Sequence, residues 1–217
     1  MRLGLRICLV LVAAFATAAC AAASDFSFTG TFTQDNNVQL FDFALSAPSV
    51  VTLQTYSYAG GTNAAGAAIA RGGFDPVVIV WDGAGNFVNQ YDDGFIPDVN
   101  QDAVTGQTWD SFGVDLLGPG AYIVSLMQYD NYANTFSLAD GFIHAGDPNF
   151  TLSLPNSGST GFFWDDTGNQ RDGHWALDIM GVDSASMPSA AVPEPGAGIL
   201  VAVGAVLLGL KKGLRRG

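Results

Sequence analysis

The stretch DPVVIVWDGAGNFVNQYDD (75–93) contains two apolar segments on either side of a short polar turn. Residues 75–82 and 86–93 are rich in β-branched and aromatic side chains, which is typical of strands. The intervening DGAGN supplies the glycine, aspartate and asparagine that tight turns favour. This stretch predicts two strands joined by a turn, and the same pattern recurs along the chain.

Nine segments carry this strand pattern, and no ten-residue window outside the termini has helical periodicity. They are residues 26–32, 38–45, 49–58, 75–82, 86–93, 111–117, 121–130, 149–154 and 174–182. The spacing predicts an all-β fold: a single antiparallel, jelly-roll-like β-sandwich of about nine strands, with long loops at 131–148 and 155–173. Alternation along the strands predicts a set of buried residues. They are Val78, Val80, Leu116, Ile123, Leu126, Leu152 and Leu177.

The amino terminus has the pattern of an export signal. Arg2 and Arg6 precede an uncharged apolar run over 7–23, which ends in three alanines before Ser24. This pattern predicts a helical signal peptide over 1–23 that is removed by a signal peptidase. Two alternatives stay open: a retained membrane anchor, and a lipoprotein in which Cys20 carries the lipid.

The carboxyl terminus, residues 191–217, combines three features in a fixed order. The motif Pro193, Glu194, Pro195 is followed by an apolar segment over 197–210, predicted to be helical, and then by four cations. This order resembles the PEP-CTERM sorting signal of Gram-negative bacteria. The resemblance implies processing by an exosortase, a temporary membrane tether and an association with exopolysaccharide, with cations kept on the cytoplasmic side. A plain stop-transfer anchor is the alternative.

Between the two ends, residues 24–192 are strongly acidic. They contain nineteen aspartates, no glutamate or lysine, and two arginines, for a formal charge of −17. This charge argues against nucleic acids and anionic membranes as partners and favours divalent cations. Both cysteines, Cys8 and Cys20, lie in the predicted signal peptide, so no disulfide is expected in the mature domain.

Residues 74–122 resemble the bacterial pre-peptidase C-terminal domain, a small β-sandwich of exported proteins. The shared features are an aspartate before an apolar strand, a D-x-x-G turn, an Asp-Asp pair, an Asp-Ser pair and G-x-Y. Here they are Asp75, 82–85, Asp92 with Asp93, Asp110 with Ser111, and 120–122. The resemblance implies one sandwich domain over 24–190. Such domains are often appended to a protease, and we expect no room for one in this chain.

The densest acidic segment, YDDGFIPDVNQDAVTGQTWDS (91–111), is the candidate metal site. Asp98, Asn100 and Asp102 form D-x-N-x-D, which can place three oxygens on one side of a loop. The predicted calcium ligands are Asp92, Asp93, Asp98, Asn100, Asp102 and Asp110. The segment fits an EF-hand poorly, because Ala103 and Trp109 stand in place of its glycine and its glutamate and no flanking helices are predicted. A solvated acidic turn is the alternative.

The residues give little support for catalysis. No cysteine nucleophile is expected after processing, no G-x-S-x-G motif is present, and His144 and His174 are the only histidines. We therefore expect a non-catalytic structural or adhesive module of the cell envelope or extracellular polysaccharide matrix. The alternative is a calcium-dependent glycan-binding module that uses Trp109 and Trp164, and a hydrolase is a distant third.

Overall fold

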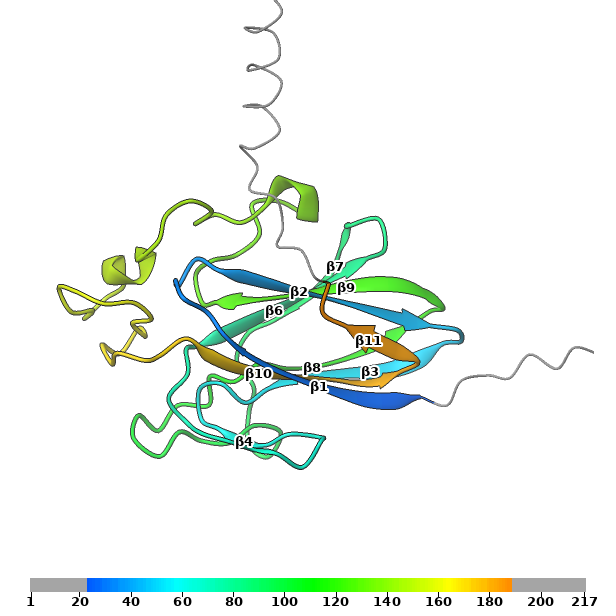
Figure 1. Ribbon diagram of the computed structural model, residues 1–217, viewed down its shortest axis with the longest axis horizontal. Helices are drawn as coiled ribbons and strands as arrows, with labels where there is room; N and C mark the ends of the chain where they lie inside the picture. Colours follow the sequence, from blue (N-terminus) through cyan, green and yellow to red (C-terminus); the bar gives the residue numbers. More distant parts are fainter. Residues whose placement is uncertain (1–22, 189–217) are drawn as a thin grey trace, which may run out of the picture.

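The structure is a computed structural model and describes residues 23–188 (Figure 1). The strands are β1 (Ser24–Thr31), β2 (Val38–Leu45), β3 (Ser49–Thr55), β4 (Gly61–Thr62), β5 (Ala68–Ile69), β6 (Pro76–Asp82), β7 (Phe87–Tyr91), β8 (Phe112–Leu117), β9 (Gly120–Gln128), β10 (His174–Val182) and β11 (Ser184–Ser186). Two short 3-10 turns complete the described part, η1 (Leu138–Asp140) and η2 (Phe150–Ser153). Residues 23–188 are therefore all-β, as predicted.

Both terminal predictions fall outside the described residues. They are the signal peptide predicted over 1–23, of which residues 1–22 are not described, and the sorting signal over 191–217 with Pro193, Glu194 and Pro195, including the helices expected there. Within residues 23–188, no helix has the length and apolar character needed to cross a membrane.

Two antiparallel sheets form the two layers seen in Figure 1. One sheet has the order β1-β10-β3-β8 and the other β11-β2-β9-β6-β7, with β4 and β5 paired separately. The pairing is nested, because β1 pairs with β10, β2 with β9 and β3 with β8. Segments far apart in the sequence therefore lie side by side, and the segment after β9 packs on the outer face of β6 and β9 before β10 begins.

The main core lies between the two sheets. It combines apolar residues of β3 and β10 with those of β2, β6 and β9 on the opposite layer. Four of the predicted core residues are fully buried in it: Val78, Val80, Leu126 and Leu177. This face-to-face packing of two apolar surfaces is the defining feature of a β-sandwich.

A second apolar cluster covers the outer face of β6 and β9. Its fully buried members include Val77, Ile79, Trp81 and Met127, and the segment after β9 packs onto them through Tyr132 and its neighbours. Strand β6 is thus buried on both faces, which explains its continuous apolar sequence. Ile123 also faces this second cluster and is half-buried there.

One predicted strand is wrong. Residues 149–154 form η2 rather than a strand, and Leu152 is only half-buried. Asn149 adopts a left-handed conformation (φ 70°), and its N–H donates to Oδ1 of the buried Asp35 at 2.7 Å. Thr151 donates through its N–H to the other oxygen of Asp35, at 3.1 Å. The alternating pattern here reflects a turn anchored by one carboxylate.

The predicted burial of Leu116 is also wrong, because its side chain is 77% exposed. In β8 the inward positions are Gly113 and Leu117. The ring of Tyr91 fills the space next to Gly113 on the inward side, so a Cβ at this position would lie 2.3 Å from the ring. A glycine gives no apolar signal, so the sequence pattern was assigned to the wrong face by one residue.

Candidate metal centre

Three aspartates converge at one end of the sheet that contains β6 and β7. Asp75 directly precedes β6, and Asp92 and Asp93 directly follow β7. The two strands are antiparallel neighbours, so the start of one lies beside the end of the other. One carboxylate oxygen from each aspartate lies within 4.8 Å of the other two. Two oxygen ligands of one Ca²⁺ ion lie at most about 5 Å apart, so these three fit a single ion.

Asp75 is the most unusual member of the cluster. It is only 3% exposed, and its Oδ1 has no hydrogen-bond partner among residues 23–188. Burial raises the pKa of its carboxyl well above the ordinary value, and the charges of Asp92 and Asp93 raise the pKa further. Its backbone is fixed, since its carbonyl accepts a 2.7 Å hydrogen bond from the N–H of Tyr129. A buried carboxylate without a donor is costly unless a cation neutralises it.

Asp92 and Asp93 differ in their surroundings. Asp92 is half-buried, and its Oδ2 accepts a 3.1 Å hydrogen bond from the hydroxyl of Tyr132, whereas its buried Oδ1 has no partner in the described part of the chain. Burial raises the pKa of Asp92. Loss of surrounding water and the charge of Asp92 raise the pKa of Asp93 to about 6. Each carboxyl therefore resists ionisation, which a bound cation would reverse.

Gln128 is a further polar side chain in this region. It is 1% exposed, and neither its amide oxygen nor its amide nitrogen has a partner among the described residues. On β9 it is directly opposite Pro76, the residue after Asp75. Amide oxygens, like carboxylates, are ligands of Ca²⁺.

The chemistry of the cluster selects a hard cation. Its ligand atoms are carboxylate oxygens, with neither imidazole nor thiolate in the group. Oxygen-only sites suit calcium, magnesium or manganese, whereas zinc prefers nitrogen and sulfur.

The structure brings together only two of the six predicted ligands, Asp92 and Asp93, and adds Asp75 to them. Asp98 is exposed, and its backbone carbonyl accepts a 2.7 Å hydrogen bond from Gln54. Asn100 donates from Nδ2 to the carbonyl of Gly60 at 2.8 Å. The D-x-N-x-D spacing therefore does not join its residues to the cluster.

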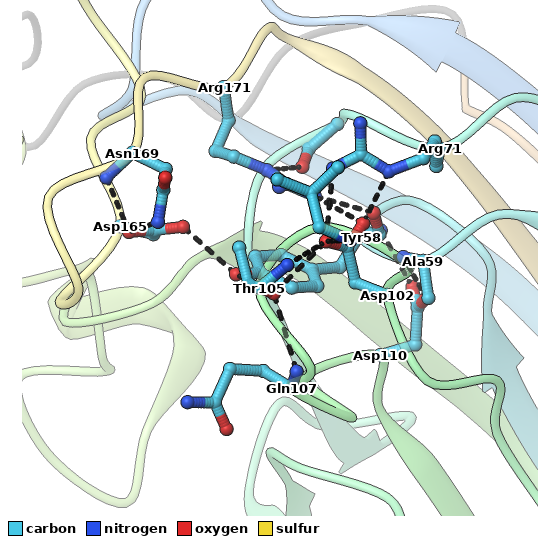
Figure 2. A network of polar contacts seen from close by, with 12 residues as sticks. Tyr58, Ala59, Arg71, Asp102, Thr105, Gln107, Asp110, Asp165, Asn169 and Arg171 are labelled. Carbon is cyan, nitrogen blue, oxygen red and sulfur yellow. Dashed lines mark hydrogen bonds and ion pairs between the residues drawn. The ribbon is translucent and has the colours of Figure 1, made fainter.

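Asp102 is bound by the two arginines of the domain (Figure 2). Arg71 lies 2.6 Å and Arg171 3.5 Å from its Oδ2. Burial alone would raise the pKa of Asp102, but hydrogen bonds from Arg71 and Thr105 outweigh it and hold the pKa below the ordinary range. Arg171 also covers the ring of Tyr58, with its guanidinium carbon 3.7 Å from the ring centroid. This carboxylate is part of a structural ion-pair network.

Asp110 is buried and serves the turn after β3 (Figure 2). Its carboxylate accepts hydrogen bonds from the hydroxyl of Thr55 and the N–H groups of Tyr58 and Ala59, at 3.0, 3.0 and 2.8 Å. One hydroxyl and two backbone N–H groups therefore occupy this carboxylate.

The two tryptophans proposed for glycan binding are half-buried. Trp109 packs at a tilt on Tyr58, with ring centroids 5.2 Å apart. Trp164 donates from Nε1 to the carbonyl of Thr160 at 3.1 Å, and Gly158 lies close against its ring. Trp109 therefore packs on the loop after β3, and Trp164 helps to order its own loop.

Asp75 is the functional candidate that the predicted ligand set lacks. The signal was present, because an aspartate before a fully apolar strand is one of the features shared with the pre-peptidase C-terminal domain. Asp75 lies near Asp92 only because β6 pairs with β7, and a motif of closely spaced ligands does not reveal such a pair.

Comparisons with known proteins leave the family open: no protein-family model matches the chain, and no curated protein matches it. The two resemblances described above therefore stay predictions from their motifs.

Proposed function

We propose that this chain is an exported, non-catalytic module of the cell envelope or extracellular matrix of a Gram-negative bacterium, and that its sandwich binds calcium through Asp75, Asp92 and Asp93. The single observation that carries the cation site is the buried carboxylate of Asp75, which has no hydrogen-bond donor on Oδ1 and faces two further aspartates. The nested strand pairing supports the finer assignment of a jelly roll.

Calcium is the preferred ion for three reasons. The site offers only oxygen ligands. Asp93 is exposed, so water can enter the coordination shell beside it. The three aspartates lie in loops next to β6 and β7 rather than in a rigid cage, which suits the flexible geometry of calcium. Calcium accepts 6–8 oxygens in flexible geometry, so carbonyls and water would complete the shell. Extracellular modules bind it with dissociation constants on the order of 10⁻⁴–10⁻³ M, which suits a protein outside the cell.

A structural role is favoured over catalysis by the positions of the histidines. The ring of His144 stacks on Phe150 with centroids 3.9 Å apart. Nε2 of His174 contacts the carbonyl of Ala70 at 3.0 Å, and Nδ1 contacts Asp172. Both rings are thus engaged in packing loops. The matrix polysaccharide and an exosortase are the proposed partners, with the carboxyl-terminal segment as a transient tether.

The test is a calcium titration of the mature domain followed by calorimetry and thermal melting. Calcium should bind and raise the melting temperature of the wild type, and Asp75→Asn should abolish both responses. Asp98→Asn is the matched control, because it removes an exposed carboxylate of the D-x-N-x-D motif and should leave both responses unchanged. Retention of calcium binding by Asp75→Asn would refute this site.

A further inference from the structure

A shallow groove of ≈ 330 Å³ opens beside the edge strand β7, on the side covered by the segment that follows β9. Six residues line it: Phe87, Gln90, Ala133, Asn134, Thr135 and Phe136. Its volume lies at the lower end of the range of small-ligand sites, ~300–1,000 Å³.

Two aromatic rings form the apolar part of the groove. Phe136 is 78% exposed, and its ring meets Phe87 edge-on at a centroid distance of 5.3 Å and an interplanar angle of 74°. Phe136 is not on a free loop tip, because its backbone carbonyl accepts a 3.0 Å hydrogen bond from the N–H of Phe87. Phe87 in turn packs edge-on against the buried Trp81. The groove thus holds an exposed aromatic face on an anchored backbone.

Amide and hydroxyl groups form the rest of the lining. Asn134 donates from Nδ2 to the carbonyls of Asp140 and Phe142, at 2.9 and 3.3 Å, which fixes the amide orientation. The hydroxyl of Thr135 donates to Oδ2 of Asp140 at 2.5 Å and accepts from the N–H of Ser137 at 3.1 Å, which leaves its second lone pair for a ligand donor. Gln90 is exposed and adds a second amide. None of the six lining residues is charged, although residues 24–192 carry a charge of −17.

We propose that this groove binds a neutral saccharide chain. A sugar ring presents an apolar C–H face, which matches the exposed ring of Phe136, and a rim of hydroxyl groups, which matches the amides and the threonine hydroxyl. An anionic polysaccharide would meet the surrounding aspartates, including Asp140 behind Thr135. A purely apolar ligand would strip water from the amides without replacing it.

The groove adjoins the candidate metal centre but does not share its ligands. Gln90 lies in β7 two residues before Asp92, and Tyr132, which donates to Asp92, directly precedes the lining residues 133–136. The saccharide proposal rests on the proposed function, since it gives the proposed polysaccharide partner a binding site, and it uses residues outside the predicted Trp109 and Trp164 pair.

The experiment is affinity electrophoresis of the mature domain, in calcium, through native gels containing dextran, galactomannan, xyloglucan or alginate. At least one of the three neutral polysaccharides should retard the wild type, and alginate should not. Phe136→Ala should weaken the retardation roughly tenfold, and Gln90→Ala should weaken it less. Phe162→Ala, which truncates another exposed phenylalanine outside the groove lining, is the matched control and should migrate like the wild type.

Three outcomes would overturn the proposal: no retardation by any neutral polysaccharide, retardation that survives Phe136→Ala, or retardation lost instead in Trp109→Ala or Trp164→Ala. Because Phe136 is exposed, its truncation should leave the fold intact, and the melting temperature of each variant verifies this. The calcium titration of the same samples reports on Asp75 separately, so failure of the groove and failure of the metal centre are distinguishable.

Discussion

Arg71 donates two hydrogen bonds to Asp102, from Nε to Oδ2 at 2.6 Å and from Nη2 to Oδ1 at 3.0 Å. Arg171 approaches the same Oδ2 at 3.5 Å. These are the only two lysine or arginine residues between positions 24 and 192, so both strong cations of the domain are assigned to one carboxylate. The arginines therefore join loops rather than neutralise the acidic surface, which leaves the Asp75 cluster without a cationic partner among the described residues.

Removing this carboxylate should destabilise the domain. In Asp102→Asn, the buried guanidinium of Arg171, with 4% of its side chain exposed, loses its anionic partner. Breaking a buried ion pair from one side typically costs ~3–5 kcal/mol. Urea unfolding measures the loss, and Asp98→Asn, at an exposed aspartate four residues earlier, should change the free energy of unfolding by less than about 0.5 kcal/mol. Equal effects of the two substitutions would contradict the network.

The same carboxyl should give a pH signature. Hydrogen bonds from Arg71 and Thr105 lower the pKa of Asp102 in the folded state, against the effect of burial. Its stabilisation is therefore fully present above the unfolded pKa, ~3.9, and is lost as pH falls through that value toward the folded one. The difference in unfolding free energy between wild type and Asp102→Asn should shrink between pH 6 and pH 3. A constant difference would show that Asp102 does not titrate as the network requires.

Much of the fold could be predicted from the sequence, because most strands have one face in the core and one in water. Eight of the nine predicted strand segments contain a strand. The exceptions have local physical causes: Asp35 organises residues 149–154 into a turn, and Gly113 hides the inward face of β8. Neither cause can be read from hydrophobic alternation, since one is a contact over 116 residues and the other is the absence of a side chain.

The candidate site was less predictable than the fold. The D-x-N-x-D spacing placed emphasis on Asp98 and Asp102, yet Asp102 binds the arginines. The cluster instead joins Asp75 to Asp92 across the pairing of β6 and β7. Strand pairing decides which aspartates meet, and close spacing along the chain does not identify that set among nineteen aspartates.

The revised core makes a paired prediction. Leu177 is fully buried between the sheets, whereas Leu116 is 77% exposed on the outer face of β8. Leu177→Ala should cost ~2–5 kcal/mol because it leaves a cavity, and Leu116→Ala should cost less than about 0.5 kcal/mol. Chemical unfolding of both variants checks this. A larger loss in Leu116→Ala would place that side chain in the core after all.

The terminal signals predict a specific mature protein. Cleavage before Ser24 and near Pro193-Glu194-Pro195 would remove six of the eight lysine and arginine residues. Intact-mass spectrometry of protein from a host with an active exosortase should find both new ends. Pro193→Ala combined with Pro195→Ala should slow the carboxyl-terminal cleavage. A mature species that keeps Lys211 to Arg216 would instead support a permanent anchor.

Cation selectivity distinguishes the Asp75 centre from general screening of the acidic surface. Oxygens of the three aspartates lie within 4.8 Å of one another, and a cation at their centre relieves both their repulsion and the burial of Asp75. Calcium at about 100 times its dissociation constant should add ~2.7 kcal/mol of stability by mass action. Magnesium should add less, because it demands a strict octahedron and retains its water. Sodium chloride at matched ionic strength should give only the screening contribution. Thermal melts in the three chlorides test this order, and equal shifts in all three would show that the aspartates respond to ionic strength rather than to a bound ion.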